Sequence, residues 1–334
     1  MEKIKKLLNF NFNQPSRLIK YKAKKKAAAL LFSLFRIVLL VAVGYIVLYP
    51  LLFMIVTALR DRESYTDPSI VWIPRTFAWE NYATAVEKIR YFERLKNTLL
   101  VEIVSAAIEI VSCSVVAYGL ARFDFKLKKL LMVLLIFTIV VPSQMIVIPT
   151  MMNFAHLDFA GILGLIGKAV GTDIRPSILD TPFSFYLPSI FGVGLRSGIM
   201  IFIYIQFFKG LPKELEEAAW IDGAGPIKTF LRIAVPSSGV VFLTVTIFSI
   251  VWHWNDYYLA AMYMTDNQPL AVALANLPSL LSSLGGNLNG SLMNTISGSV
   301  VMACCLLFIT PVLIMYVILQ RKFVKSIDRV GITG

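Results

Sequence analysis

The 334-residue chain is poor in the residues that most often bind metals or carry redox chemistry, with three cysteines and two histidines. Cys113, Cys304 and Cys305 all lie inside apolar runs and form no CxxC pair, so we interpret them as packing residues. His156 and His253 are far apart in the sequence, which disfavours a shared metal site. We therefore predict neither a metal centre nor a catalytic residue in this chain.

The sequence also lacks a phosphate-binding loop. The stretch from Gly161 to Ala169 contains Gly167-Lys168, but five residues separate Gly161 from Gly167, one more than the motif has, and Ala169 lacks the hydroxyl that binds Mg²⁺. We therefore expect the chain to bind no cofactor itself. Any work driven by ATP has to come from another protein.

Charged residues are scarce, at 16% of the chain, whereas 57% of the residues are hydrophobic and the mean hydropathy is +0.72. This composition lies outside that of soluble proteins and predicts a membrane protein with several spans. The first apolar run is too long for a signal peptide, so we expect it to remain as a span. The net charge of +12 does not indicate a nucleic-acid partner, because the basic residues flank the apolar runs.

Six apolar segments are long enough, or nearly so, to cross a bilayer, which predicts an all-α membrane protein with six transmembrane helices. Pro142 and Pro149 should bend or break the third segment. Arg196 interrupts the fourth, so either this arginine lies near the outer surface or the run 183–195 is partly re-entrant. The predicted spans are 37–59, 97–121, 130–155, a segment ending near Phe208, 237–254 and 296–319.

The distribution of basic residues predicts the orientation of these spans. Of the 32 lysines and arginines, 22 lie before span one or after spans two, four and six. Because cytoplasmic segments are enriched in lysine and arginine, both termini are predicted to be cytoplasmic, with the N-terminus near anionic lipid. We divide the chain into a basic cytoplasmic segment at 1–35, a transmembrane domain at 36–320 and a cytoplasmic tail at 321–334.

Between spans four and five, on the predicted cytoplasmic side, the sequence indicates a helix, a glycine break and a second helix. The first helix begins with acidic residues, which the helix dipole favours there, and Gly223 and Gly225 should end it. Pro226 can open the second helix, which places Lys228 and Arg232 on a polar face. We interpret this helix-turn-helix as a hairpin that docks on a partner.

The hairpin resembles the EAA loop of ABC importer permeases. That pattern is Glu-Ala-Ala, three residues, Gly, nine residues and Ile-x-Leu-Pro, and here only Val235 departs from it. Further motifs are similar to the carbohydrate branch, typified by maltose-type inner-membrane permeases, and the resemblance covers roughly residues 70 to 334. They include Glu80-Asn81-Tyr82, the stretch Ala117 to Arg122, Pro142, Ile148-Pro149 and Trp254-Asn255-Asp256-Tyr257.

The resemblance implies a permease subunit in a bacterial or archaeal cytoplasmic membrane. Such subunits work with two ATP-binding subunits, which hold ATP and Mg²⁺, with a second permease of related but different sequence, and with an external solute-binding protein. It also implies that the hairpin transmits force from the ATPase to the spans. The residues expected to carry this coupling are Glu217, Ala218, Ala219, Asp222, Gly223, Ile233 and Pro236.

Two acidic residues in span two and one amide after span five are candidates for the solute pathway. Glu102 and Glu109 lie seven residues apart and hence on one helical face, and carboxylates in a membrane are costly enough to indicate a bundle interior or a wet pathway. A structural hydrogen bond to a neighbouring span is the favoured explanation, and binding of sugar hydroxyls is the alternative. Asn255 is a candidate through the resemblance alone.

Three other functions compete with sugar import. An ABC permease for a non-sugar solute would share the hairpin. A secondary transporter would show paired halves with interrupted spans at matching positions, and no convincing symmetry of this kind is present. A membrane enzyme would need a convergent set of catalytic side chains, which two distant histidines do not supply.

Overall fold

A computed structural model describes residues 14–61, 64, 67, 72–158, 161–277, 279 and 290–331. The chain divides into two compact units, residues 1–57 and 58–334. The described residues form helices and connecting turns, with an isolated bridge between Arg60 and Phe77 and no strand. The prediction of an all-α protein is therefore confirmed for this part of the chain.

The described part of the first unit is helix α2, Gln14–Ala58, which includes Pro50 and whose last residue belongs to the second unit. Its stretch Lys24–Ala58 is long and apolar enough to cross a membrane, and none of its most apolar window is buried. The predicted span at 37–59 lies within this helix up to Ala58. The helix begins more than twenty residues earlier and runs through residue 35 without a break, because the lysine- and alanine-rich segment before the apolar run contains strong helix formers.

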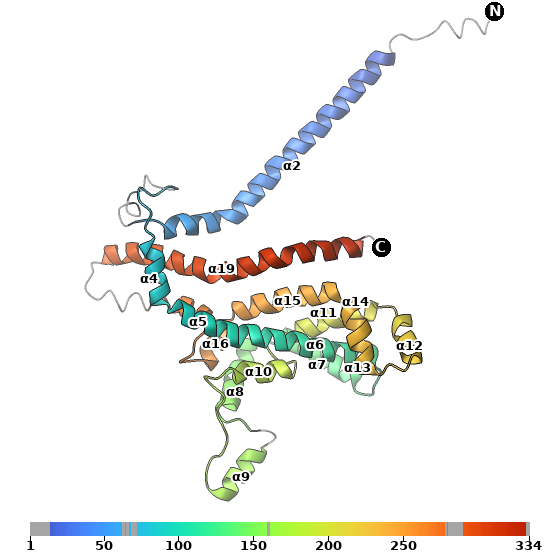
Figure 1. Ribbon diagram of the computed structural model, residues 1–334, viewed down its shortest axis with the longest axis vertical. Coiled ribbons are helices and arrows are strands. Elements are labelled where there is room, and N and C mark those ends of the chain that lie inside the picture. Colours follow the sequence, from blue (N-terminus) through green and yellow to red (C-terminus); the bar gives the residue numbers. More distant parts are fainter. Residues whose placement is uncertain are drawn as a thin grey trace, which may run out of the picture. The chain divides into compact units, whose positions relative to one another are not determined.

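In the second unit, one continuous helix forms the second predicted span. It comprises α5 (Tyr91–Thr98), a π-helical turn η1 (Leu99–Ile103) and α6 (Val104–Arg122). Helix α6 packs against α11 (Ser197–Gly210) and α15 (Gly239–Trp254), as Figure 1 shows. The apolar core between these three helices contains the buried residues Cys113, Tyr118, Tyr204, Phe208 and Val245.

The third predicted span is broken at Pro142. Helix α7 (Lys128–Val140) and helix α8 (Ser143–Ala155) meet at an angle of 103° across the extended residues Val141 and Pro142. Pro149 lies inside α8 and does not end it. The expected break is therefore confirmed at Pro142, whereas the helix continues through Pro149.

The fourth predicted span is interrupted at Arg196. This residue takes a left-handed conformation, with φ of 59°, and α11 starts directly after it, while the preceding run forms the separate helix α10 (Phe183–Ile190). The guanidinium of Arg196 lies 5.0 Å from the ring centroid of Trp252, which is a cation–π contact. Residues 191–195 thus separate α10 from Arg196, which directly precedes α11, and the apolar run is interrupted here as expected.

The last two predicted spans are α15 and part of α19 (Gly290–Gly331). An 82° bend at Ser238 separates α15 from the helices that precede it, and α19 contains the apolar stretch Gly298–Gln320. Shorter helices complete the second unit on the described residues. They are α4 (Glu80–Lys88), α9 (Ile162–Val170), α12 (Glu214–Ile221), α13 (Pro226–Thr229), η2 (Phe230–Ala234), α14 (Val235–Ser237), α16 (Tyr258–Tyr263) and α17 (Leu270–Ala275).

Length and apolarity identify three helices that can cross a membrane within the described part of the chain, or five if each bent pair counts as one span. Helix α11, with 14 residues, is a shorter apolar helix at the place of the fourth predicted span. The structure therefore shows a helical membrane protein with several spans. The number six and the cytoplasmic location of both termini stay predictions.

Candidate coupling hairpin

The predicted hairpin is formed by α12 and α13, which connect through residues 222–225. Helix α12 has three acidic residues in its first turn, Glu214, Glu216 and Glu217, where they complement the positive end of the helix dipole. Pro226 opens α13 at a first-turn position, where its missing N–H costs nothing. The start of α12 and the start of α13 therefore lie where the acidic residues and the proline of the sequence predict them.

Gly223 produces the reversal of the chain. Its φ of +77° is left-handed, a conformation that glycine adopts without steric cost. Its N–H donates to the carbonyl of Trp220 at 3.0 Å, and the N–H of Ala224 donates to the carbonyl of Ala219 at 2.9 Å. These two bonds form a Schellman cap, which satisfies the carbonyl groups left free at the end of α12.

The hairpin exposes an apolar surface. Ile221 is 86% exposed and Ile227 is 77% exposed, and they are joined by Leu215, Trp220 and Leu231. Single exposed apolar residues are ordinary on a soluble surface, but a cluster on one short hairpin indicates a site of protein contact.

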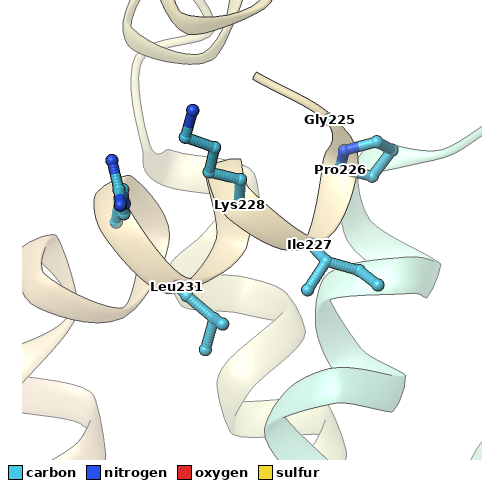
Figure 2. A pocket seen from close by; sticks show the side chains of 6 residues that line it. Gly225, Pro226, Ile227, Lys228 and Leu231 are labelled. Carbon is cyan, nitrogen blue, oxygen red and sulfur yellow. The ribbon is translucent and has the colours of Figure 1, made fainter.

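A hollow of about 510 Å³ lies along the second helix of the hairpin. Figure 2 shows Ile227 and Leu231 on one side of this helix and Lys228 on the other. The apolar and the charged side chains that line the hollow therefore do not point to the same side of the helix. Its lining residues are Gly225, Pro226, Ile227, Lys228, Leu231 and Arg232.

The seven residues predicted to carry coupling occupy different environments. Glu217, Ala218, Asp222, Gly223 and Pro236 are exposed, whereas Ile233 is half-buried. Ala219 is 9% exposed and faces its own chain. Five of these residues lie on α12 and in the turn that follows it, whereas Ile233 and Pro236 lie on the segment that leads to α15. Their part in coupling stays a prediction.

Sequence reasoning missed the contact that joins the hairpin to the body of the second unit. Glu216, next to the predicted contact residue Glu217, is buried and pairs with Arg122, the last residue of α6. Arg122 Nε lies 3.0 Å from Glu216 Oε1, and the two side chains are 4% and 5% exposed. Arg122 and Glu216 are 94 positions apart, so no local pattern in the sequence relates them. The spacing of Glu216 and Ala219 at i and i+3 does place these two buried residues on one face of α12.

A second buried polar cluster lies within the membrane-spanning helices. Glu109 on α6 accepts a hydrogen bond from the Ser197 hydroxyl on α11, and its Oε2 lies 3.3 Å from His253 Nε2 on α15. The other ring nitrogen of His253 lies 2.9 Å from the Ser249 carbonyl oxygen. One carboxylate thus connects three helices. Gly194 leaves it room, since a Cβ there would lie 3.0 Å from Glu109 Oε1.

The three predicted solute-pathway residues do not form one site. Glu102 lies in the π-helical turn η1, is 1% exposed, and has no hydrogen-bond partner for either carboxylate oxygen within the described residues. Asn255 is exposed after α15 and donates to the Val251 carbonyl at 2.8 Å. No hydrogen bond between described residues joins Glu102, Glu109 and Asn255 to one another.

Several known proteins with similar sequences are named as transport permeases. Protein LplC of Bacillus subtilis is 28% identical over 303 residues, which cover 90% of this chain and 94% of that protein. The melibiose/raffinose/stachyose import permease protein MelC of Bacillus subtilis is 28% identical over 289 residues, which cover 85% of this chain and 91% of that protein.

The fold is also similar to that of a solved structure. A chain of a bacterial ABC transporter involved in the import of the acidic polysaccharide alginate superposes with a TM-score of 0.65 at 17% identity, covering 89% of this chain and 98% of that chain. Residues 111–329, which include the whole hairpin, match the model of one family. The chain therefore belongs to the family of inner membrane components of binding-protein-dependent transport systems.

Proposed function

We propose that this chain is the permease subunit of an ATP-driven importer that carries a sugar or oligosaccharide across a bacterial or archaeal cytoplasmic membrane. Its family works with an ATPase and a solute-binding protein. The observation that carries the proposal is the exposed apolar hairpin next to the membrane helices. The sugar class is supported by relatives such as MelC, whose name gives melibiose, raffinose and stachyose as its solutes.

In the proposed mechanism, the exposed surface of α12 and α13 docks in a cleft of an ATP-binding subunit. Ile221, Ile227 and Leu231 supply the apolar contact, and the exposed carboxylates of Glu217 and Asp222 accept charge-assisted hydrogen bonds. Two such ATPases, a second permease of related sequence and an external solute-binding protein complete the importer. ATP and Mg²⁺ are held by the ATPases, and their closure moves the hairpins and tilts the spans.

The solute pathway belongs to this proposal too. Glu102 is its best candidate, because neither carboxylate oxygen has a hydrogen-bond partner among the described residues, so both could accept hydrogen bonds from solute hydroxyl groups when the helices rearrange. Asn255 is a second candidate at the exposed end of α15. One oxygen of Glu109 already accepts a hydrogen bond from Ser197, and the other lies 3.3 Å from His253 Nε2, so a structural role agrees better with these contacts.

Co-purification of the tagged chain from native membranes tests the docking. We expect the wild type to bring down a nucleotide-binding subunit, and Leu231→Glu to reduce the amount recovered at least tenfold, because a charge is then desolvated in the interface. Leu165→Glu on α9 is the matched control, since Leu165 is equally apolar and 69% exposed. Equal recovery from wild type, Leu231→Glu and Leu165→Glu would contradict the proposal.

A further inference from the structure

One guanidinium group holds the docking helix to a span. Arg122 Nε donates to Glu216 Oε1 at 3.0 Å, and Arg122 Nη2 donates to the carbonyl oxygen of Leu211 at 2.8 Å. Glu216 lies in the first turn of α12, and Leu211 lies in the connection that leads from α11 into that helix. The end of α6 is thereby fixed both to the hairpin and to the chain that enters it.

The surroundings of the pair make this attachment stiff. Tyr118, one turn before Arg122 on α6, contacts the rings of Phe123, Phe208 and Phe230, with centroids 5.8, 5.6 and 5.0 Å away. The side chains of Arg122 and Glu216 are only 4% and 5% exposed, so water is largely excluded from the pair. Buried charges are screened less than exposed ones, and leaving one of them unpaired is costly, so the two groups stay together.

A nearby pair on the same predicted side of the membrane is different. Lys128 Nζ lies 2.9 Å from Asp124 Oδ1, but the Asp124 side chain is 97% exposed and both residues belong to one short segment. Such an exposed pair is screened by water and contributes little. It connects no distant elements, whereas the pair of Arg122 and Glu216 connects residues 94 positions apart.

Arg122 also stands at the end of the helix that organises the membrane core. Helix α6 carries Glu109, which contacts Ser197 on α11 and His253 on α15. A displacement of α12 that pulls on Arg122 is therefore passed along α6 to both neighbouring helices. Helix α6 thus has one polar contact with the hairpin at its end and a second polar cluster with α11 and α15 inside the membrane core.

Building on the proposed function, we propose that Arg122 is a positioning residue that makes α6 move as one body with the docking helix when the ATP-binding subunits displace the hairpin. Arginine suits this place because its planar fork serves Glu216 and the Leu211 carbonyl at once. A lysine carries one nitrogen and can hold only one of the two firmly. The pair thus converts docking of a partner into displacement of a span.

The distance between α12 and α6 in the assembled importer tests this inference. Nitroxide labels are attached to Glu214→Cys on α12 and Val111→Cys on α6, which are both exposed and lie outside the proposed docking contact, in a chain whose native cysteines are replaced by alanine. Pulsed electron paramagnetic resonance then gives the distribution of distances between the two labels, first without nucleotide and then after trapping with ATP and vanadate. We expect one narrow distribution, unchanged by trapping, in the parent, and a shifted or broadened one after trapping in Glu216→Gln.

The controls separate loss of rigidity from loss of fold and from failure of docking. Asp124→Asn removes only the exposed pair, and its distance distribution should match that of the parent. If Glu216→Gln does not assemble, Arg122→Lys takes its place, and its distance distribution should broaden after trapping by an intermediate amount. A distribution unaffected by trapping in both pair variants overturns the inference. Failure of the parent to trap nucleotide with a partner would instead contradict the proposed function.

Discussion

The turn of the hairpin allows a test in which two glycines two positions apart respond differently. Gly223 has a φ of +77°, whereas Gly225 has a φ of −75° and a ψ of 169°. A Cβ at either glycine would meet no atom within 4 Å. Crowding is therefore equal at the two sites, and backbone conformation alone separates them.

The expected magnitudes follow from this difference. A non-glycine residue in the left-handed region costs roughly 1–2 kcal/mol, and replacing glycine by alanine regains about 0.4–1 kcal/mol through the unfolded chain. Gly223→Ala should therefore destabilise the docked hairpin by about 1 kcal/mol, whereas Gly225→Ala should be neutral or slightly stabilising. Gly223→Pro should be far worse, because proline fixes φ near −65° and removes the N–H that donates to Trp220.

The assay is ATP-driven uptake into vesicles that contain the whole importer, with membrane insertion followed by the amount of the chain in the membrane. We expect Gly223→Pro to abolish uptake at normal insertion, Gly223→Ala to lower it several-fold, and Gly225→Ala to leave it unchanged. If Gly225→Ala were as damaging as Gly223→Ala, the left-handed turn would not be the reason. Wild-type uptake in Gly223→Pro would refute the coupling role of the hairpin.

Two further predictions concern the membrane helices. Glu109→Ala leaves the Ser197 hydroxyl buried without its acceptor, which costs about 1–3 kcal/mol, so the thermal midpoint should fall; unchanged solute affinity and uptake in Glu109→Gln would remove any direct role in solute binding. Gly198→Ala should lower the midpoint as well, because its Cβ would lie 2.7 Å from Thr138 Oγ1, and overpacking of this kind costs about 1–3 kcal/mol. Gly210→Ala, with nothing within 4 Å, is the control and should leave the midpoint unchanged.

The positions of glycine and proline in the sequence predicted the helix limits of the hairpin well. Gly223 ends α12 and Pro226 begins α13, as expected from the left-handed preference of glycine and the fixed φ of proline. Pro142 likewise breaks the third predicted span. These features depend on a few consecutive residues, so no tertiary information is needed to find them.

Other features depend on neighbours that the sequence does not place. Pro149 and Pro142 are both prolines in one apolar run, yet only Pro142 breaks the helix, because a helix tolerates proline where packing favours continuation. The pairing of Arg122 with Glu216 and of Glu109 with His253 depends on which helices lie side by side. Periodicity gives the face of a residue and not the identity of its distant partner.

The two buried polar contacts of α6 have a common physical consequence. Glu109 lies inside this helix and Arg122 ends it, and each is bonded to another element through a group that water does not reach. Either buried polar group would be costly in its site without a partner, so any motion of the importer has to keep both contacts together or replace them together. A helix held in this way moves as a unit with what it is bonded to. We therefore expect α6 to be the element of this chain through which displacement of the hairpin reaches the membrane core.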